Sequence, residues 1–213
     1  MSKAYLSQLP LVAILRGVTP HNCIEVAGIL IECGYRCIEV PLNSPSPLES
    51  IAKLSAEFGH QALIGAGTVT NLTQLNQAQQ SGAQLIFAPN CNESVIRAAK
   101  QKELVMIPGV ATPSEAFAAI EAGADALKLF PAQLITPNIV KAMKDVLPKN
   151  VPLLAVGGID EGNMTPFLTA GCTGFGLGGA LYKPNDSLEQ IGQKATSLMS
   201  SYCLAKSNNQ SKT

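Results

Sequence analysis

The sequence predicts one α/β domain, a single (β/α)8 TIM barrel. Eight strand-sized apolar runs alternate along the chain with segments of helical spacing. The runs are almost continuously hydrophobic, which is typical of parallel strands covered on both faces. A chain of 213 residues has the length of one such barrel. We expect the barrel to span residues 1–203 and residues 204–213 to form a polar, disordered tail.

The predicted strands are short and recur through the whole barrel segment. They cover residues 11–15, 37–41, 62–66, 84–88, 104–107, 126–130, 153–156 and 173–177. Side chains in a strand point alternately to its two faces. A charged residue inside one of these runs must therefore face either the barrel interior or the helix layer.

The predicted helices begin at cap and proline signals and end at glycines. The start signals are Thr19-Pro20, Ser44-Pro45, Thr112-Pro113 and Thr136-Pro137. Residues 92–101 and 113–122 show the helical spacing clearly. Just before the next strand, where a left-handed residue ends a helix, stand Gly34, Gly59, Gly82, Gly123 and Gly171.

A doubly wound sheet is the competing architecture. Such a sheet usually carries a glycine-rich phosphate loop of the Gly-x-Gly-x-x-Gly type after its first strand. Here the first strand is followed by Arg16-Gly17-Val18-Thr19, which does not match that loop. The barrel is therefore favoured.

Composition excludes several classes of partner. Lysine plus arginine and aspartate plus glutamate each number 15, so the net charge is zero and no basic surface for nucleic acid or an anionic membrane is expected. Tryptophan is absent and aromatic residues are 5%, which disfavours stacking platforms for bases. No apolar run approaches the roughly 20 residues that span a bilayer, and no signal peptide is seen.

The cysteines and histidines do not form a metal or redox motif. Six cysteines lack the two-residue spacing of such motifs, and the two histidines, His21 and His60, lie far apart in sequence. Free thiols in a reducing, cytoplasmic compartment are expected.

Lys128 is the first chemical anomaly, because it interrupts the apolar strand Ala126-Leu127-Lys128-Leu129-Phe130. Burial lowers the pKa of a lysine and makes the free amine available as a nucleophile toward a ketone. The alternative is a lysine whose stem packs on apolar neighbours while its ammonium group reaches water.

Glu39 is the matching anomaly in the second strand. Each layer of side chains inside a barrel comes from alternate strands, and strands two and six contribute to the same layers from opposite walls. Glu39 and Lys128 can therefore reach one cavity. A carboxylate there can balance the lysine charge and then move protons. A buried structural ion pair is the alternative.

Other candidate residues lie at the ends of strands, where barrel enzymes place their sites. Arg16 ends strand one and suits a carboxylate or phosphate, although for Arg16 taken alone a salt bridge at the rim is the favoured interpretation. Thr68 follows Gly65-Ala66-Gly67, glycines that serve tight helix–strand packing in the simplest interpretation. Pro89 follows strand four, where a plain turn is the simplest interpretation.

Two glycine clusters follow strands seven and eight. They comprise Gly157 and Gly158 after Val156, and Gly176, Gly178 and Gly179 at the last strand. Loops at these two places commonly bind phosphate in barrels through backbone N–H groups. Ordinary turns are the alternative, but two clusters at the two expected strands favour a phosphate site.

Together these residues resemble the class I aldolases that cleave 2-keto-3-deoxy-6-phosphosugar acids. The resemblance runs from about residue 9 to residue 182. It rests on the segments Ala13-Ile14-Leu15-Arg16-Gly17, Glu39-Val40-Pro41-Leu42-Asn43-Ser44-Pro45, Ile64-Gly65-Ala66-Gly67-Thr68-Val69, Ala126-Leu127-Lys128-Leu129-Phe130-Pro131 and Ala155-Val156-Gly157-Gly158.

The resemblance implies a trimeric barrel that uses no metal and no other cofactor. It implies that Lys128 forms a Schiff base and that Glu39 is the acid/base group. It places Arg16 and Thr68 at the carboxylate end of the substrate. Gly157, Gly158 and Gly178 match the phosphate site, in which Gly179 stands where the family commonly has serine.

The same resemblance separates two branches of substrate. The phosphogluconate branch resembles Glu-Val-Thr-Leu-Arg-Thr after strand two and Thr-Gly-Gly after strand seven. This chain has Glu-Val-Pro-Leu-Asn-Ser at 39–44 and Val-Gly-Gly at 156–158, similar to the phosphogalactonate branch. Asn43 replaces an arginine there, which leaves more of the carboxylate binding to Arg16. Val156 replaces a hydroxyl side chain near the carbons where the two sugar acids differ.

The expected activity is that of an aldehyde-lyase. It would cleave 2-dehydro-3-deoxy-6-phospho-D-galactonate reversibly to pyruvate and D-glyceraldehyde 3-phosphate. The alternatives are cleavage of the phosphogluconate epimer and a non-catalytic barrel that binds a sugar phosphate. The second alternative has no need for both Lys128 and Glu39.

Overall fold

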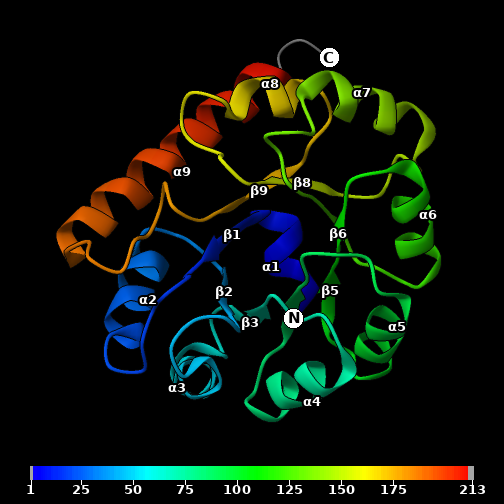
Figure 1. The fold of residues 1–213 in the computed structure, drawn as a ribbon. Coiled ribbons are helices and arrows are strands. Elements are labelled where there is room, and N and C mark those ends of the chain that lie inside the picture. The colour runs from blue at the N-terminus through cyan, green and yellow to red at the C-terminus, as the bar shows by residue number, and fades with distance from the viewer. Residues whose placement is uncertain (1, 211–213) are drawn as a thin grey trace.

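Parallel strands form a barrel inside a ring of helices in the computed structural model, which describes residues 2–210 (Figure 1). The strands are β1 (Leu11–Ile14), β2 (Cys37–Pro41), β3 (Leu63–Gly67), β4 (Leu85–Phe87), β5 (Val105–Ile107), β6 (Gly109–Val110), β7 (Leu127–Leu129), β8 (Leu153–Val156) and β9 (Gly174–Leu177). Their order is β5-β4-β3-β2-β1-β9-β8-β7-β6, and every neighbouring pair is parallel. The predicted barrel is confirmed.

Within residues 2–210, nine strand segments replace the eight predicted ones, because the fifth strand is interrupted. Pro108 separates β5, which pairs with β4, from β6, which pairs with β7. Proline has no N–H for a strand ladder, but its carbonyl accepts a hydrogen bond from Lys128 N at 2.9 Å. The two segments together therefore occupy the place of one barrel strand.

The helices cover the outside of the barrel, apart from the first. They are α1 (Ser2–Gln8), α2 (Cys23–Glu32), α3 (Pro47–Phe58), α4 (Leu72–Gln80), α5 (Glu93–Gln101), α6 (Pro113–Glu121), α7 (Pro137–Val146), α8 (Met164–Thr169) and α9 (Leu188–Gln210). Among the described residues, no helix is both long and apolar enough to cross a membrane.

Helix α1, which the sequence pattern did not predict, closes the amino-terminal end of the barrel. Figure 1 shows it in the middle of the ring. Its Leu6 is buried with Val12, Cys37 and Leu63, the interior residues near the starts of their strands. One end of the barrel is thus filled by apolar side chains, which leaves the carboxyl ends of the strands for a site.

The predicted helix signals are confirmed at some positions and wrong at others. Thr112 caps α6 in a capping box with Glu115, and Pro137 occupies the first turn of α7. Helix α2 begins later than Thr19-Pro20, with Asn22 as its N-cap, because Asn22 Oδ1 accepts from Thr19 N and holds the preceding residues in a turn. Helix α3 begins at the second Ser-Pro pair, Ser46-Pro47, after a turn in which Ser44 N donates to Pro41 O.

Four of the five predicted left-handed glycines have the expected positive φ: Gly34, Gly82, Gly123 and Gly171. Gly59 is the exception, with φ of −61° and a right-handed conformation. Three further residues, His60, Gln61 and Ala62, separate it from β3, and Gln61 N donates a hydrogen bond to Phe58 O. The turn there has room to leave the helix without a left-handed residue.

The prediction of a disordered tail from residue 204 is wrong for residues 204–210. Helix α9 continues to Gln210, and Tyr202 and Ala205 are buried. Tyr202 packs edge-on against Phe175 of β9 and donates a hydrogen bond to Thr173 O at 3.1 Å. These contacts stabilise a helix whose polar composition concealed its apolar face. Residues 211–213 lie outside the described part of the chain.

Candidate active site

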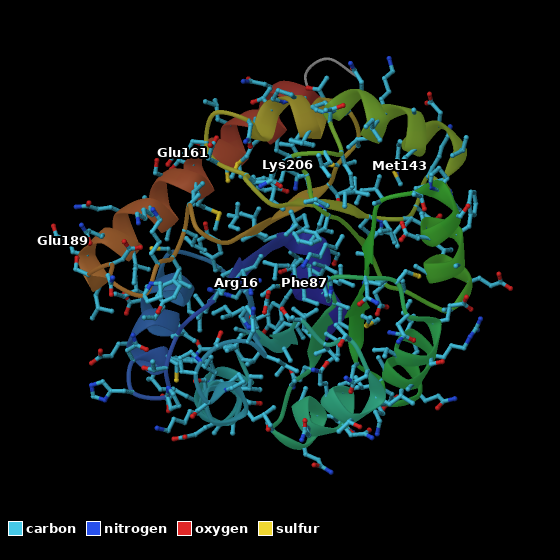
Figure 2. The ribbon with its side chains drawn as sticks, in the orientation of Figure 1. Arg16, Phe87, Met143, Glu161, Glu189 and Lys206 are labelled. Carbon is cyan, nitrogen blue, oxygen red and sulfur yellow. The ribbon has the colours of Figure 1, made fainter. Side chains whose placement is uncertain are left out.

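A cavity of about 640 Å³ opens at the carboxyl ends of the strands. All ten residues that the sequence singled out for the site line it. They are Arg16, Glu39, Thr68, Pro89, Lys128, Val156, Gly157, Gly158, Gly178 and Gly179. In Figure 2, Arg16 and Phe87 lie in the central part of the ring, whereas Glu189 lies at its periphery. The topology therefore gathers residues from seven strands around one space.

Lys128 lies in the middle of β7 and faces the barrel interior on the same side as Ala126. The residue is 7% exposed. Its Nζ lies 4.3 Å from the centroid of the Phe87 ring and 4.8 Å from that of Phe130. Burial lowers the pKa of Lys128 to about 8, with the Arg16 charge acting in the same direction and the Glu39 charge opposing it. An appreciable fraction of free amine is therefore available near neutral pH.

Glu39 lies in β2, where its side chain is 2% exposed. Burial raises the pKa of Glu39 to about 8, while the charges of Lys128 and Arg16 and a hydrogen bond from the Gly67 backbone oppose the rise. Its Oε2 has no hydrogen-bond partner in the described structure. A carboxyl group with a pKa near neutrality and an open oxygen can take up or release a proton within the cavity.

Gly67 makes room for the Glu39 carboxyl group. A Cβ atom at position 67 would overlap Glu39 Oε2 and lie 2.6 Å from Oε1. The interpretation that Gly65 and Gly67 serve helix–strand packing is wrong for Gly67, because it faces the interior. The signal was present in the sequence, since residues 63, 65 and 67 share one face of a strand.

Arg16 follows β1 and is held by the segment that follows β2. Its Nη1 donates to Asn43 Oδ1 at 2.6 Å. The adjacent Gly17 N donates to Ser44 Oγ at 3.0 Å. The salt bridge at the rim that was considered for Arg16 is thus replaced by a bond to a neutral amide, which preserves the guanidinium charge for an anion.

Thr68 adopts a left-handed backbone conformation with φ of 61°. A β-branched residue in this region is strained by about 1–3 kcal/mol, and such strain is concentrated at functional sites. The conformation is held by β3 and by a hydrogen bond from Thr68 N to Phe87 O at 3.1 Å. The neighbouring Pro89 also lines the cavity, and its carbonyl approaches Gly109 so closely that a Cβ there would overlap it.

The loop after β8 depends on two left-handed glycines. Gly157 has φ of 108° and Gly158 has φ of 65°. Asn163 Nδ2 donates to Gly158 O at 2.7 Å. The Gln133 side-chain amide bridges the two glycines when its nitrogen faces the Gly157 carbonyl and its oxygen faces the Gly158 N–H. In this orientation Nε2 donates to Gly157 O at 3.3 Å and Oε1 accepts from Gly158 N at 3.2 Å. A bound anion would share or displace the bond at Gly158 N.

The loop after β9 is more open. Leu181 N and Tyr182 N both donate to Gly178 O, which forms a tight turn at the cavity. A Cβ at Gly179 would meet no atom within 4 Å. There is therefore room at position 179 for the serine that commonly stands there in the similar aldolases. With glycine at this position, an anion can approach the backbone without obstruction.

Sequence reasoning missed several residues of the cavity wall. They are Ile14, Phe130, Ile159, Asp160, Ala180, Tyr182, Lys183 and Pro184. Ile14 and Phe130 lie in predicted strands, and the others lie in the loops after the predicted strands of residues 153–156 and 173–177, which was the available signal. Lys183 adds a third basic side chain to the wall, besides Arg16 and Lys128.

The arrangement combines a buried amine, a buried carboxyl group of raised pKa, and loops that can receive anions. A lysine amine in such a place can form an imine with a ketone, and the carboxyl group can move the associated protons. The three basic side chains suit a substrate that carries negative charge at more than one position.

Comparisons with known proteins agree with this chemistry. The family model for KDPG and KHG aldolase matches residues 3–195. The chain is 43% identical over 196 residues to the 2-dehydro-3-deoxy-6-phosphogalactonate aldolase of Escherichia coli (strain K12), covering 92% of this chain and 96% of that protein.

Solved structures extend the similarity to three dimensions. The structure described as "Native KDPGal structure" superposes with a TM-score of 0.92 and 42% identity, over 94% of this chain and 97% of that one. A cube-shaped protein cage designed by fusing symmetric oligomeric domains contains a similar unit, with a TM-score of 0.94 and 41% identity over 96% of this chain and 76% of that one.

Proposed function

This chain belongs to the KDPG and KHG aldolase family, and from that premise we propose that it cleaves 2-dehydro-3-deoxy-6-phospho-D-galactonate reversibly to pyruvate and D-glyceraldehyde 3-phosphate. The observation that carries the proposal is the buried amine of Lys128 in one cavity with the buried carboxyl group of Glu39. This combination is the one that imine-forming aldol cleavage needs.

The proposed reaction begins when the neutral Lys128 amine attacks the C2 ketone. The resulting carbinolamine loses water and gives an iminium ion. Glu39, directly or through water, takes the proton of the C4 hydroxyl as the C3–C4 bond breaks. The electron pair of that bond passes to the iminium and forms an enamine, while C4 leaves as the aldehyde. Protonation of the enamine at C3 and hydrolysis then release pyruvate and restore the amine.

The remaining predicted residues bind the two ends of the substrate. Arg16 and Thr68 are assigned to the carboxylate. The backbone around Gly157, Gly158, Gly178 and Gly179 is assigned to the phosphate, and Pro89 and Val156 to the walls between the two ends. These roles are proposals, supported by the fact that all of these residues line one cavity.

Borohydride trapping tests the assignment of Lys128. The wild-type protein incubated with pyruvate and borohydride should become covalently labelled, because reduction makes the imine permanent. Lys128→Ala should abolish the label, whereas Lys141→Ala, which removes an exposed lysine of α7, should retain it. Labelling of Lys128→Ala at full yield would refute the proposal.

Pyruvate release from the galactonate and gluconate epimers, measured side by side with a chelator present, tests the substrate. A clear preference for the galactonate epimer is expected from Asn43 and Val156. Equal or reversed rates would show that these two positions do not set the preference. Binding of a sugar phosphate with no cleavage of either epimer would favour a non-catalytic barrel.

We further propose a homotrimer in the cytoplasm. The similarity to a component of a designed cage built from symmetric oligomeric domains supports a symmetric oligomer. Large apolar side chains also remain exposed on α6, α7 and the loop before α7, among them Phe117, Leu134 and Ile139. The cytoplasmic assignment rests on the six cysteines, which are all free thiols and suit a reducing compartment.

A further inference from the structure

Asn43 is hydrogen-bonded to a residue that lines the cavity. It follows β2, is exposed, and does not line the cavity itself. Its Oδ1 accepts the 2.6 Å hydrogen bond from Nη1 of Arg16, whose guanidinium does line the cavity. A hydrogen bond to a charged donor is stronger than one between neutral groups, so this contact restricts the arginine effectively.

A second bond fixes the backbone beside the same arginine. Ser44 is 8% exposed, and its Oγ accepts from Gly17 N at 3.0 Å. Gly17 has φ of 88°, and a Cβ there would lie 2.7 Å from Pro184 Cγ. Arg16 is therefore held at its side chain by Asn43 and at the next peptide by Ser44. We refer to Asn43 and Ser44 as the clamp.

We propose that the clamp positions the Arg16 guanidinium for an anionic group of the substrate, with Asn43 as a positioning residue for the aldolase reaction. This inference rests on the proposed function, which supplies a substrate with a carboxylate and a phosphate. A guanidinium has five N–H donors, so one bond to Asn43 leaves others for an anion. An unrestrained arginine side chain loses rotamer entropy when it binds an anion. Because the clamp already restrains Arg16, part of this entropy has been lost before the substrate binds.

The neutral amide is essential to this role. An amide oxygen restrains Arg16 without cancelling its charge, whereas a carboxylate in the same place would form an ion pair and compete with the substrate. The clamp therefore predicts that a nearly isosteric change from asparagine to aspartate is more harmful to anion binding than removal of the side chain. A merely structural role for Asn43 predicts the reverse order, because aspartate retains the size and the hydrogen bond.

The test compares Asn43→Ala, Asn43→Asp and Ser44→Ala with the wild type in the aldol-addition direction. Pyruvate supplies the carboxylate alone and D-glyceraldehyde 3-phosphate supplies the phosphate alone, so separate KM values show which anion Arg16 binds. Asn43→Ala should raise one KM by about fivefold to tenfold, the equivalent of one such hydrogen bond, with kcat within about twofold. Asn43→Asp should raise the same KM further. Asn71→Ala is the matched control, because Asn71 is also exposed and accepts one hydrogen bond, from Gln74 N, outside the cavity.

Two results would overturn the proposal. One is that the KM values for both reactants are unchanged in Asn43→Ala and in Asn43→Asp. The other is that Asn43→Asp raises the KM less than Asn43→Ala does. Titration calorimetry with pyruvate and with inorganic phosphate gives the same comparison without turnover. If Asn43→Ala is poorly folded, Asn43→Asp and Ser44→Ala still decide the question, because each should raise the same KM and unchanged values in both would overturn the proposal. A wild-type protein that forms no imine with pyruvate would refute the proposed function, whereas the calorimetric anion affinities would still test the clamp.

Discussion

At the scale of single residues, Glu39 and Lys128 show what an apolar interior does to two opposite charges. Burial favours the neutral form of both groups, which raises the pKa of the carboxyl group and lowers that of the amine, each to about 8. Their mutual attraction opposes both shifts. Both groups can therefore exchange protons with a substrate or with water near neutral pH.

Glu39→Gln should move the pH dependence of imine formation to lower pH. The negative charge of Glu39 raises the pKa of Lys128, so its removal lets that pKa fall further below about 8. More free amine is then present at a given pH below the midpoint. The rate of borohydride trapping with pyruvate, measured from pH 5 to 10, checks the shift. A midpoint that moves upward would contradict the coupling, whereas turnover of substrate should fall because the proton-transferring group is lost.

Gly67→Ala should reduce both the activity and the stability of the protein. The new methyl group occupies the place of the Glu39 carboxyl group, which must move away from its position in the cavity. A displacement of about 1 Å in a catalytic group can lower the rate by about 100-fold, and overpacking costs about 1–3 kcal/mol. Measured kcat and the free energy of unfolding check both effects.

Gly179→Ala is the matched control for the effect of this substitution on stability. The added Cβ meets no atom within 4 Å, and the residue is not among those with positive φ. The free energy of unfolding should change by less than about 1 kcal/mol. Normal kcat in Gly67→Ala would show that the Glu39 carboxyl group does not need the space that Gly67 leaves.

At the scale of secondary structure, side-chain capping and tertiary packing determine where the helices begin and end. Thr112 and Glu115 form a reciprocal capping box, and the helix begins where the sequence predicts. At Thr19-Pro20, a side-chain turn made by Asn22 displaced the start. Helix α9 is the clearest case, because its buried face includes Tyr202 and Ala205 although its outer face is polar.

Tyr202 should anchor the end of α9 to the barrel. Tyr202→Phe removes the hydrogen bond to Thr173 O and should cost about 1 kcal/mol of unfolding free energy. Tyr202→Ala also removes the ring contact with Phe175 and should cost about 3–5 kcal/mol. Urea denaturation of the two variants checks the order. Identical stability of wild type and Tyr202→Ala would mean that this end of the helix contributes nothing to folding.

At the scale of the whole molecule, the two ends of the barrel have different contents. The amino-terminal end is filled by α1 and apolar side chains, and the carboxyl-terminal end holds the cavity with all of the predicted site residues. Interior strand positions near the cavity include glycines, at Gly67 and Gly176, and charged residues, at Glu39 and Lys128. The core thus supports the fold at one end and leaves volume for chemistry at the other.

The proposed trimer predicts a particle three times the mass of the 22.3 kDa chain. Light scattering after size-exclusion chromatography measures this mass directly. Leu134 is 72% exposed, the highest value among the large exposed hydrophobic side chains of the described residues. Leu134→Glu should weaken association, because a charge would replace an apolar contact. A monomeric mass for the wild type at micromolar concentration would refute the trimer.

Local patterns in the sequence were sufficient for the barrel, for most strand positions, and for the selection of Lys128 and Glu39. A charged residue in an apolar strand is visible without coordinates because alternation and burial are properties of a few adjacent residues. The gathering of all ten residues at one cavity followed from a rule of the fold, which places the carboxyl ends of parallel strands at one end.

Only the tertiary structure decided the contacts between segments distant in sequence. It placed Gly67 against the Glu39 carboxyl group, joined Arg16 to Asn43, and packed Tyr202 on Phe175. Distances across a barrel depend on register, rotamers and packing at many residues at once, and no short window of sequence contains that information. The residues proposed for the chemistry of the site were therefore identifiable from the sequence, whereas their burial and positioning belong to the folded chain.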